Sequence, residues 1–172
     1  VVEFSSYRVK AAQLEYDDSL QMWFIAFPNE RRRIPLAGCC LMQGLDPAAT
    51  DHYVSRRTSR TAHVVLARTW DDRYVFLRAH AGYVKTTEWF DWLWNWHARF
   101  GDMMGPAYAE LVAGFKSLQS IVDDEVVRRG VGIGFEAVNA LGDKIVTIRN
   151  ILQPIFDAGR VYAVPEAAVE IE

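Results

Sequence analysis

Two acidic residues lie where apolar stretches of the sequence come to an end. Asp46 closes the apolar run of residues 37–45 and is followed at once by Pro47, while Glu110 closes the run PAYAE, residues 106–110. Two carboxylates close together in a partly dry cleft repel each other unless a cation lies between them, and such oxygen ligands favour Mg²⁺ or Mn²⁺. A pair of these ions activates water for phosphodiester hydrolysis. If the two strands are parallel neighbours, Asp46 and Glu110 therefore predict metal-assisted hydrolysis.

Other kinds of catalytic site find no support in the sequence. The histidines do not have the i, i+4 spacing of a helical zinc site, and no G-x-S-x-G nucleophile motif occurs. The two cysteines, Cys39 and Cys40, are adjacent and have no visible catalytic partner. Because they lie inside an apolar run, we expect buried thiols in a reducing, intracellular setting.

Positive charge is clustered, although the net charge is −3. Arg56, Arg57 and Arg60 follow the strand that ends on Asp46, where they predict contacts with the phosphates of a nucleic acid. Lys144 lies in the first turn of a predicted helix, and a lysine beside helix-start amides favours an anion such as a DNA phosphate. For both groups, a solvated surface charge is the open alternative.

Strands and helices must position these residues, and after residue 36 they follow a regular order. We predict strands over residues 36–46, 61–69, 73–81, 105–111, 131–138 and 160–165, and helices over residues 86–100, 113–129 and 142–159. The strands 61–69 and 73–81 form an antiparallel hairpin, and the later strands alternate with helices. This order predicts an α/β fold in which helices flank a mixed sheet of an antiparallel hairpin plus parallel strands.

Three local features of the sequence give further expectations. The helix 86–100 takes Thr86 as its N-cap and carries a tryptophan-rich stripe that we assign to the core rather than to base stacking. Pro154 is expected to kink or break the last helix. The glycine-rich residues 130–137 are expected to form a thin strand rather than a phosphate-binding loop.

Three motifs in this order resemble one protein family. They are GLDPA at residues 44–48, AYAEL at residues 107–111, and DKIVTIRNILQPIFDAGRVYAVP at residues 143–165. Together they resemble the C-terminal nuclease domain of the large terminase subunit of tailed bacteriophages, a member of the RNase H-like superfamily. The resemblance covers roughly residues 36–172.

The resemblance implies a metal-dependent endonuclease that cuts concatemeric double-stranded viral DNA with low sequence specificity. Asp46 and Glu110 would be its catalytic and metal-binding residues, with two Mg²⁺ or Mn²⁺ ions as cofactors. Its third acid would lie beyond residue 172. Lys144, Arg56, Arg57 and Arg60 would be the residues that bind DNA.

The resemblance also implies partners and a place of action. An ATPase motor domain would precede this region, the portal protein and the small terminase subunit would be further partners, and the protein would act in the cytoplasm of the infected bacterial host. No membrane is expected, because no apolar run approaches the ~20 residues of a spanning helix. We expect residues 1–36 to be an accessory segment or connector, and residues 37–172 to be the nuclease domain, truncated before its C-terminal acid.

Two other functions stay open from the sequence alone. One is an RNase H or RuvC-type nuclease or resolvase, which would share the two acids and the sheet. The other is a docking module without catalytic activity, in which the aromatic helix and the strand QMWFIAF, residues 21–27, would bind a portal or capsid partner. Metal uptake that depends on Asp46 would separate the nucleases from the docking module.

Overall fold

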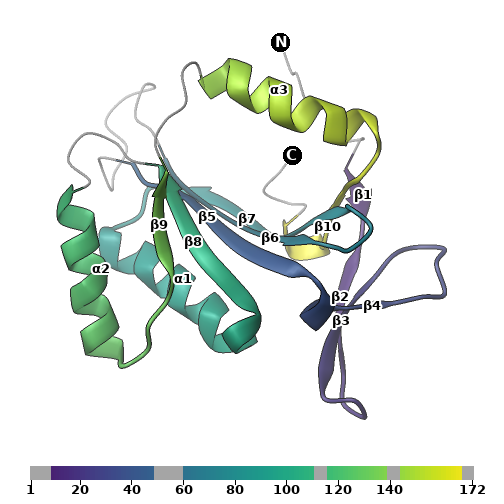
Figure 1. Cartoon of the computed structure of the whole chain (residues 1–172), viewed down its shortest axis with the longest axis horizontal. Helices are drawn as coiled ribbons and strands as arrows, with labels where there is room; N and C mark the ends of the chain where they lie inside the picture. Colours follow the sequence, from purple (N-terminus) through teal and green to yellow (C-terminus); the bar gives the residue numbers. More distant parts are fainter. Residues whose placement is uncertain (1–8, 49–59, 111–115, 139–143, 168–172) are drawn as a thin grey trace. The chain divides into compact units, whose positions relative to one another are not determined.

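A computed structural model of the chain describes residues 9–48, 60–110, 116–138 and 144–167 (Figure 1). In chain order the elements are β1 (Lys10–Ala11), β2 (Gln13–Asp17), β3 (Met22–Ala26), β4 (Ile34–Pro35), η2 (Leu36–Gly38), β5 (Cys40–Asp46), β6 (Thr61–Arg68), β7 (Tyr74–Gly82), α1 (Thr86–Phe100), η3 (Gly101–Met103), β8 (Met104–Glu110), α2 (Lys116–Arg129), β9 (Phe135–Val138), α3 (Lys144–Asp157) and β10 (Val161–Ala163). The predicted order of elements after residue 36 is confirmed.

Within the described residues, seven strands form a mixed sheet in the order β1-β10-β7-β6-β5-β8-β9. β10 runs parallel to both β1 and β7, and β8 runs parallel to β9. β6 and β7 are consecutive neighbours joined by a short turn, as the predicted hairpin requires. The predicted fold class, an α/β mixed sheet with flanking helices, is confirmed.

Contacts divide the chain into two compact units. Unit 1 comprises residues 1–41, 64–80 and 141–172, and unit 2 comprises residues 42–63 and 81–140. In unit 1, β2, β3 and β4 form a second, antiparallel sheet with Leu14 opposite Ile25 and Ile25 opposite Ile34. Ile25 and Leu36 are fully buried there. The predicted boundary between residues 36 and 37 stays a prediction.

The core of unit 2 lies between helix α1 and the strands β5 and β8. Its buried residues are Leu45, Trp89, Phe90, Leu93, Trp94, Ala107, Ala109 and Val122. Of the predicted stripe, Trp89 and Leu93 are buried in this core and Trp92 packs against it, whereas the buried Trp94 lies outside the stripe that the sequence predicted. The tryptophan-rich helix is therefore a core element, as predicted.

The segment that leads to Asp46 differs from its prediction. Residues 36–38 form the short helix η2 rather than a strand, and β5 begins at Cys40. Along β5 the burial alternates, with Leu41, Gln43 and Leu45 buried and the residues between them half-buried, whereas a nearly continuous apolar run is the pattern of a strand covered on both faces. Cys39 is half-buried and Cys40 is exposed, which also corrects the expectation of buried thiols.

Three boundary predictions are corrected by the structure. Thr86 is the first helical residue of α1, and Lys85 precedes it, with its N–H donating to Glu88 Oε2 at 3.3 Å. α3 continues through Pro154 to Asp157, so of the two predicted outcomes, a kink or a break, the break does not occur. The strand expected over residues 131–138 is confined to β9, Phe135–Val138.

Among the described residues, none of the helices is both long enough and apolar enough to cross a membrane.

Candidate active site

Asp46 is the last residue of β5, and its position follows from the strand's alternating pattern. Leu41, Gln43 and Leu45 turn inward, so Asp46 falls on the opposite face and is half-buried. Pro47 has no N–H for a sheet hydrogen bond, which ends the strand immediately after the carboxylate. The chain therefore holds Asp46 at a strand end.

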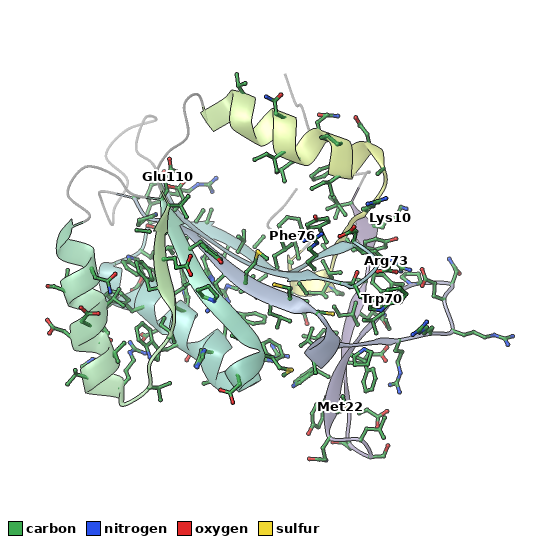
Figure 2. The ribbon with its side chains drawn as sticks, viewed as in Figure 1. Lys10, Met22, Trp70, Arg73, Phe76 and Glu110 are labelled. Atoms are coloured by element: carbon green, nitrogen blue, oxygen red, sulfur yellow. The ribbon has the colours of Figure 1, made fainter. Side chains whose placement is uncertain are left out.

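Glu110 is the last residue of β8 and is half-buried in the same way. Ala107 and Ala109 turn inward in β8, which places Glu110 on the alternate face. In the sheet, β8 lies between β5 and β9, and Glu110 is paired with Val138 of β9. The strands run toward one edge (Figure 1), where Figure 2 shows Glu110. The structure thus places Asp46 and Glu110 at the ends of adjacent strands of one compact unit.

A buried polar network holds β5 in place before it reaches Asp46. Gln43 is 1% exposed and His63 of β6 is fully buried, and His63 Nε2 lies 3.0 Å from Gln43 Oε1. Gln43 Nε2 donates to the carbonyl oxygen of Leu93 in α1 at 3.3 Å. Since the Gln43 amide nitrogen donates to Leu93, its oxygen accepts from His63, which assigns the proton to Nε2. The His63 ring also stacks near Trp92, with centroids 5.8 Å apart.

This network ties three elements to one register. A shift of β5 by one residue would remove Gln43 from both partners and move Asp46 to the other face of the sheet. Sequence reasoning did not identify Gln43 or His63 as positioning residues. The available signal was a glutamine inside the apolar run LMQGL.

A second contact fixes the chain just after Asp46. The N–H of Ala48 donates to Oγ1 of Thr61, the first residue of β6, at 3.0 Å, and Thr61 is 1% exposed. The start of β6 therefore lies beside the end of β5. Arg60 immediately precedes Thr61 and is exposed. This predicted DNA-binding residue therefore lies close to the end of β5, where Asp46 is located.

Comparison with known proteins gives a structural likeness without a sequence match. The solved structure of the P22 large terminase nuclease domain matches 96% of this chain and 72% of its own chain, with a TM-score of 0.58 and 13% sequence identity. The chain has the RNase H-like fold. A yeast mitochondrial Holliday junction resolvase is also similar, over 76% of this chain and 68% of its own, with a TM-score of 0.44 and 8% identity. No protein-family model and no curated protein matches the sequence.

The other predicted site residues of this RNase H-like chain are only partly described. Arg56 and Arg57 lie outside the described residues. Lys144 begins α3 and so lies in its first turn, as the sequence predicts; it belongs to unit 1, but its side chain lies outside the described part. The DNA-binding role of all four cations stays a prediction.

The oxygen ligands at the two strand ends fit a hard divalent cation. Carboxylates are the ligands that Mg²⁺ and Mn²⁺ prefer, and two of them on adjacent strands could share ions. The residues that the structure describes contain no group of three or more acids, histidines or cysteines that could hold a metal. Asp123 and Asp124 are exposed within helix α2 rather than at the end of a strand.

Proposed function

We propose that this chain is the nuclease domain of a viral DNA-packaging terminase, a metal-dependent endonuclease that cuts concatemeric double-stranded DNA with low sequence specificity. The observation that carries the proposal is the placement of Asp46 and Glu110 at the ends of adjacent strands in an RNase H-like sheet. The likeness to the P22 large terminase nuclease domain over nearly the whole chain supports the choice among nucleases of this fold.

In the proposed reaction, the carboxylates of Asp46 and Glu110 would hold Mg²⁺ or Mn²⁺. Two bound ions would activate a water and stabilise the charge on the leaving oxygen. Asp46 and Glu110 would be the ligands of these ions, and Glu110 would also help to orient the attacking water. The Gln43–His63 hydrogen bond keeps β5 in the register that presents Asp46.

We propose that the positive residues bind the DNA backbone rather than its bases. Arg60, beside the end of β5, would contact a phosphate, together with Arg56, Arg57 and Lys144. Phosphate contacts carry no base sequence, so they give affinity with low sequence preference. An ATPase motor domain, the portal protein and the small terminase subunit are the proposed partners, and the host cytoplasm is the proposed place of action.

A plasmid-nicking assay tests the proposal directly. With Mn²⁺ and supercoiled plasmid, Asp46→Asn and Glu110→Gln should each lower the nicking rate by about 100-fold or more, because loss of a metal ligand removes several kcal/mol of transition-state stabilisation. Asp124→Asn, which makes the same acid-to-amide change on the exposed side of α2, should keep the wild-type rate. The assay is run on this chain and on a version extended past Glu172, which tests the prediction of a third acid there.

Metal binding is measured separately by calorimetry. The expected result is Mn²⁺ uptake by the wild type and a large loss of uptake in Asp46→Ala. Absence of uptake, or uptake that Asp46→Ala leaves unchanged, would favour the docking module and overturn the nuclease proposal. Preferential cleavage of four-way junctions or of RNA–DNA hybrids over linear duplex would instead identify a resolvase or an RNase H.

A further inference from the structure

The turn between β6 and β7 presents an aromatic side chain to solvent. Trp70 is 64% exposed, the largest exposed aromatic surface among the described residues. Thr69 N–H donates to the Arg73 carbonyl oxygen at 3.0 Å, and Asp72 N–H donates to the Thr69 carbonyl oxygen at 3.1 Å. Thr69 Oγ1 also accepts from Arg73 N–H at 3.0 Å. Figure 2 shows Trp70 and Arg73 together at this turn. A tightly bonded turn therefore holds Trp70 outward.

The acids of this turn are already engaged by neighbouring arginines. Arg68 Nε donates to Asp72 Oδ1 at 2.9 Å. Arg73 is paired with Asp71 at 2.9 Å and with Glu30 at 2.7 Å. These pairs neutralise most of the charge within the turn, so the charge that remains available to a ligand comes from elsewhere.

That charge comes from Arg31 and Arg32, which precede β4. Both are exposed, and neither has a carboxylate partner within the described part of the chain, whereas the next residue, Arg33, is bonded to Asp17 at 2.8 Å. The Arg32 guanidinium lies 5.3 Å from the centre of the Trp70 ring. An exposed ring and the Arg32 guanidinium therefore share one surface of unit 1, and the exposed Arg31 is the neighbouring residue in the chain.

A hollow of about 310 Å³ adjoins the ring. It is lined by Gly38, Cys40, Arg68, Thr69, Trp70 and Asp72. Its volume lies at the small end of the range for ligand sites, roughly 300 to 1,000 Å³. A single planar ring that stacked against Trp70 would find room there, with polar groups at its edge.

We propose that Trp70, Arg31 and Arg32 form a binding site for single-stranded nucleic acid. A base has a flat face that stacks on an exposed aromatic ring, and the following phosphates can pair with guanidinium groups. Double-stranded DNA hides its base faces, so it would use the arginines but leave Trp70 without a role. The site goes beyond the proposed nuclease function, because all of its residues belong to unit 1 and none of them is a predicted metal ligand.

Binding of a fluorescent oligothymidylate, followed by anisotropy in EDTA, tests this site without metal or cleavage. Trp70→Ala should weaken binding by about tenfold or more, and Trp70→Phe should restore part of it, because stacking contributes strongly for each base. Arg31→Gln together with Arg32→Gln should weaken binding and reduce its dependence on salt. Leu20→Ala, at a residue that is 56% exposed in the β2–β3 turn, is the matched control and should bind like the wild type.

Each remaining outcome decides against the site. Wild-type affinity in Trp70→Ala, with folding verified by urea unfolding, would overturn the proposal. Equal affinity for an abasic oligonucleotide or for polyglutamate, or an equal loss of duplex binding in Trp70→Ala, would also overturn it and indicate a general anion or acidic-peptide surface. Asp46→Asn should bind the oligonucleotide normally while losing nicking, so failure of the nuclease proposal and failure of this one can be told apart.

Discussion

At the scale of single residues, the buried glutamine of β5 is the most consequential polar side chain near the proposed active site. Gln43→Leu removes both hydrogen bonds of its amide and leaves His63 Nε2 without this partner in a fully buried position. An unsatisfied buried polar group costs about 1–3 kcal/mol, so we expect Gln43→Leu to lower the free energy of unfolding by that amount. Urea unfolding measures the change.

A double replacement shows whether the loss of stability comes from the broken Gln43–His63 hydrogen bond or only from the change in side-chain volume. Gln43→Leu with His63→Leu removes both partners, so its cost should be smaller than the sum of the two single costs. Gln13→Leu, at an exposed position of β2, is the matched control and should change the free energy of unfolding by no more than about 0.5 kcal/mol. Additive single and double costs would contradict the proposed coupling.

The two predicted acids and the buried pair show what the sequence could reveal at this scale. Asp46 and Glu110 were found because each ends an apolar run, and the end of a strand is a local feature of the sequence. The link between Gln43 and His63 joins residues 20 positions apart. It depends on which strands become neighbours, and no local pattern specifies that pairing. The sequence therefore identified the acids but not the residues that hold their strand.

At the scale of elements, Gly134 lies so close to Pro106 of β8 that a side chain at position 134 would interfere with the pairing of β9 and β8. A Cβ atom at Gly134 would lie 3.1 Å from Pro106 Cβ and 3.3 Å from Pro106 Cα, and Ala107 N–H donates to the Gly134 carbonyl oxygen at 2.8 Å. Gly134→Val should destabilise the protein by about 1–3 kcal/mol, because the backbone of β8 must move to admit the side chain. Thermal unfolding measures the effect.

Gly132 provides the control for this prediction. A Cβ atom there would have no neighbour within 4 Å, so Gly132→Ala should be tolerated. A Gly134→Val protein as stable as the wild type would mean that β9 does not pack against Pro106 as described.

Ion pairs connect helix α2 to α1, and their contribution to stability depends on pH. Arg129 pairs with Glu125 at 2.7 Å and with Asp91 of α1 at 2.6 Å. Hydrogen bonds from Arg128, helped by Arg129 and opposed by burial, lower the pKa of Glu125 from 4.5 to about 2. A lowered pKa in the folded state means that Glu125 stabilises the fold above pH 4.5, and that this contribution declines as the pH falls toward 2.

Glu125→Gln tests this pH dependence. At pH 7 the variant should be less stable than the wild type by about 1 kcal/mol, since charged hydrogen bonds are lost. The difference should shrink between pH 4.5 and pH 3, as measured by urea unfolding at each pH. A difference that stays constant over this range would show that the Glu125 charge does not contribute.

The elements themselves were predictable to different degrees. Helix α1 and the hairpin of β6 and β7 were predicted closely, because their apolar spacing and turn residues are local signals. The parallel pairing of β10 with β7 and with β1 was not predicted, since short strands distant in sequence carry no sign of their partners. η2 replaced the start of a predicted strand because an apolar run alone does not distinguish a strand from a helical turn.

At the scale of the whole molecule, the net charge indicates that any attraction to DNA is local rather than general. The net charge of −3 gives no overall attraction to a polyanion, so binding must come from clusters of positive residues. The proposed duplex contacts are Arg56, Arg57, Arg60 and Lys144, whereas the proposed single-strand site uses Arg31 and Arg32. The two modes of binding should therefore respond to different substitutions.

The dependence of duplex binding on salt measures how many of these contacts form. Four phosphate contacts predict that log K falls against log salt concentration with a slope of about −3.6, and each cation removed should reduce the magnitude by about 0.9. Anisotropy of a labelled duplex in EDTA gives the slope for wild type, Arg60→Gln and Lys144→Gln. Arg128→Gln is the control, because Arg128 is paired with Glu125 on α2 and should leave the slope unchanged. A slope close to zero, or a slope that stays the same after all four cations are replaced, would contradict the DNA-binding assignment. The duplex would then be bound by other parts of the surface. The proposed metal site would still be tested independently by the calorimetry.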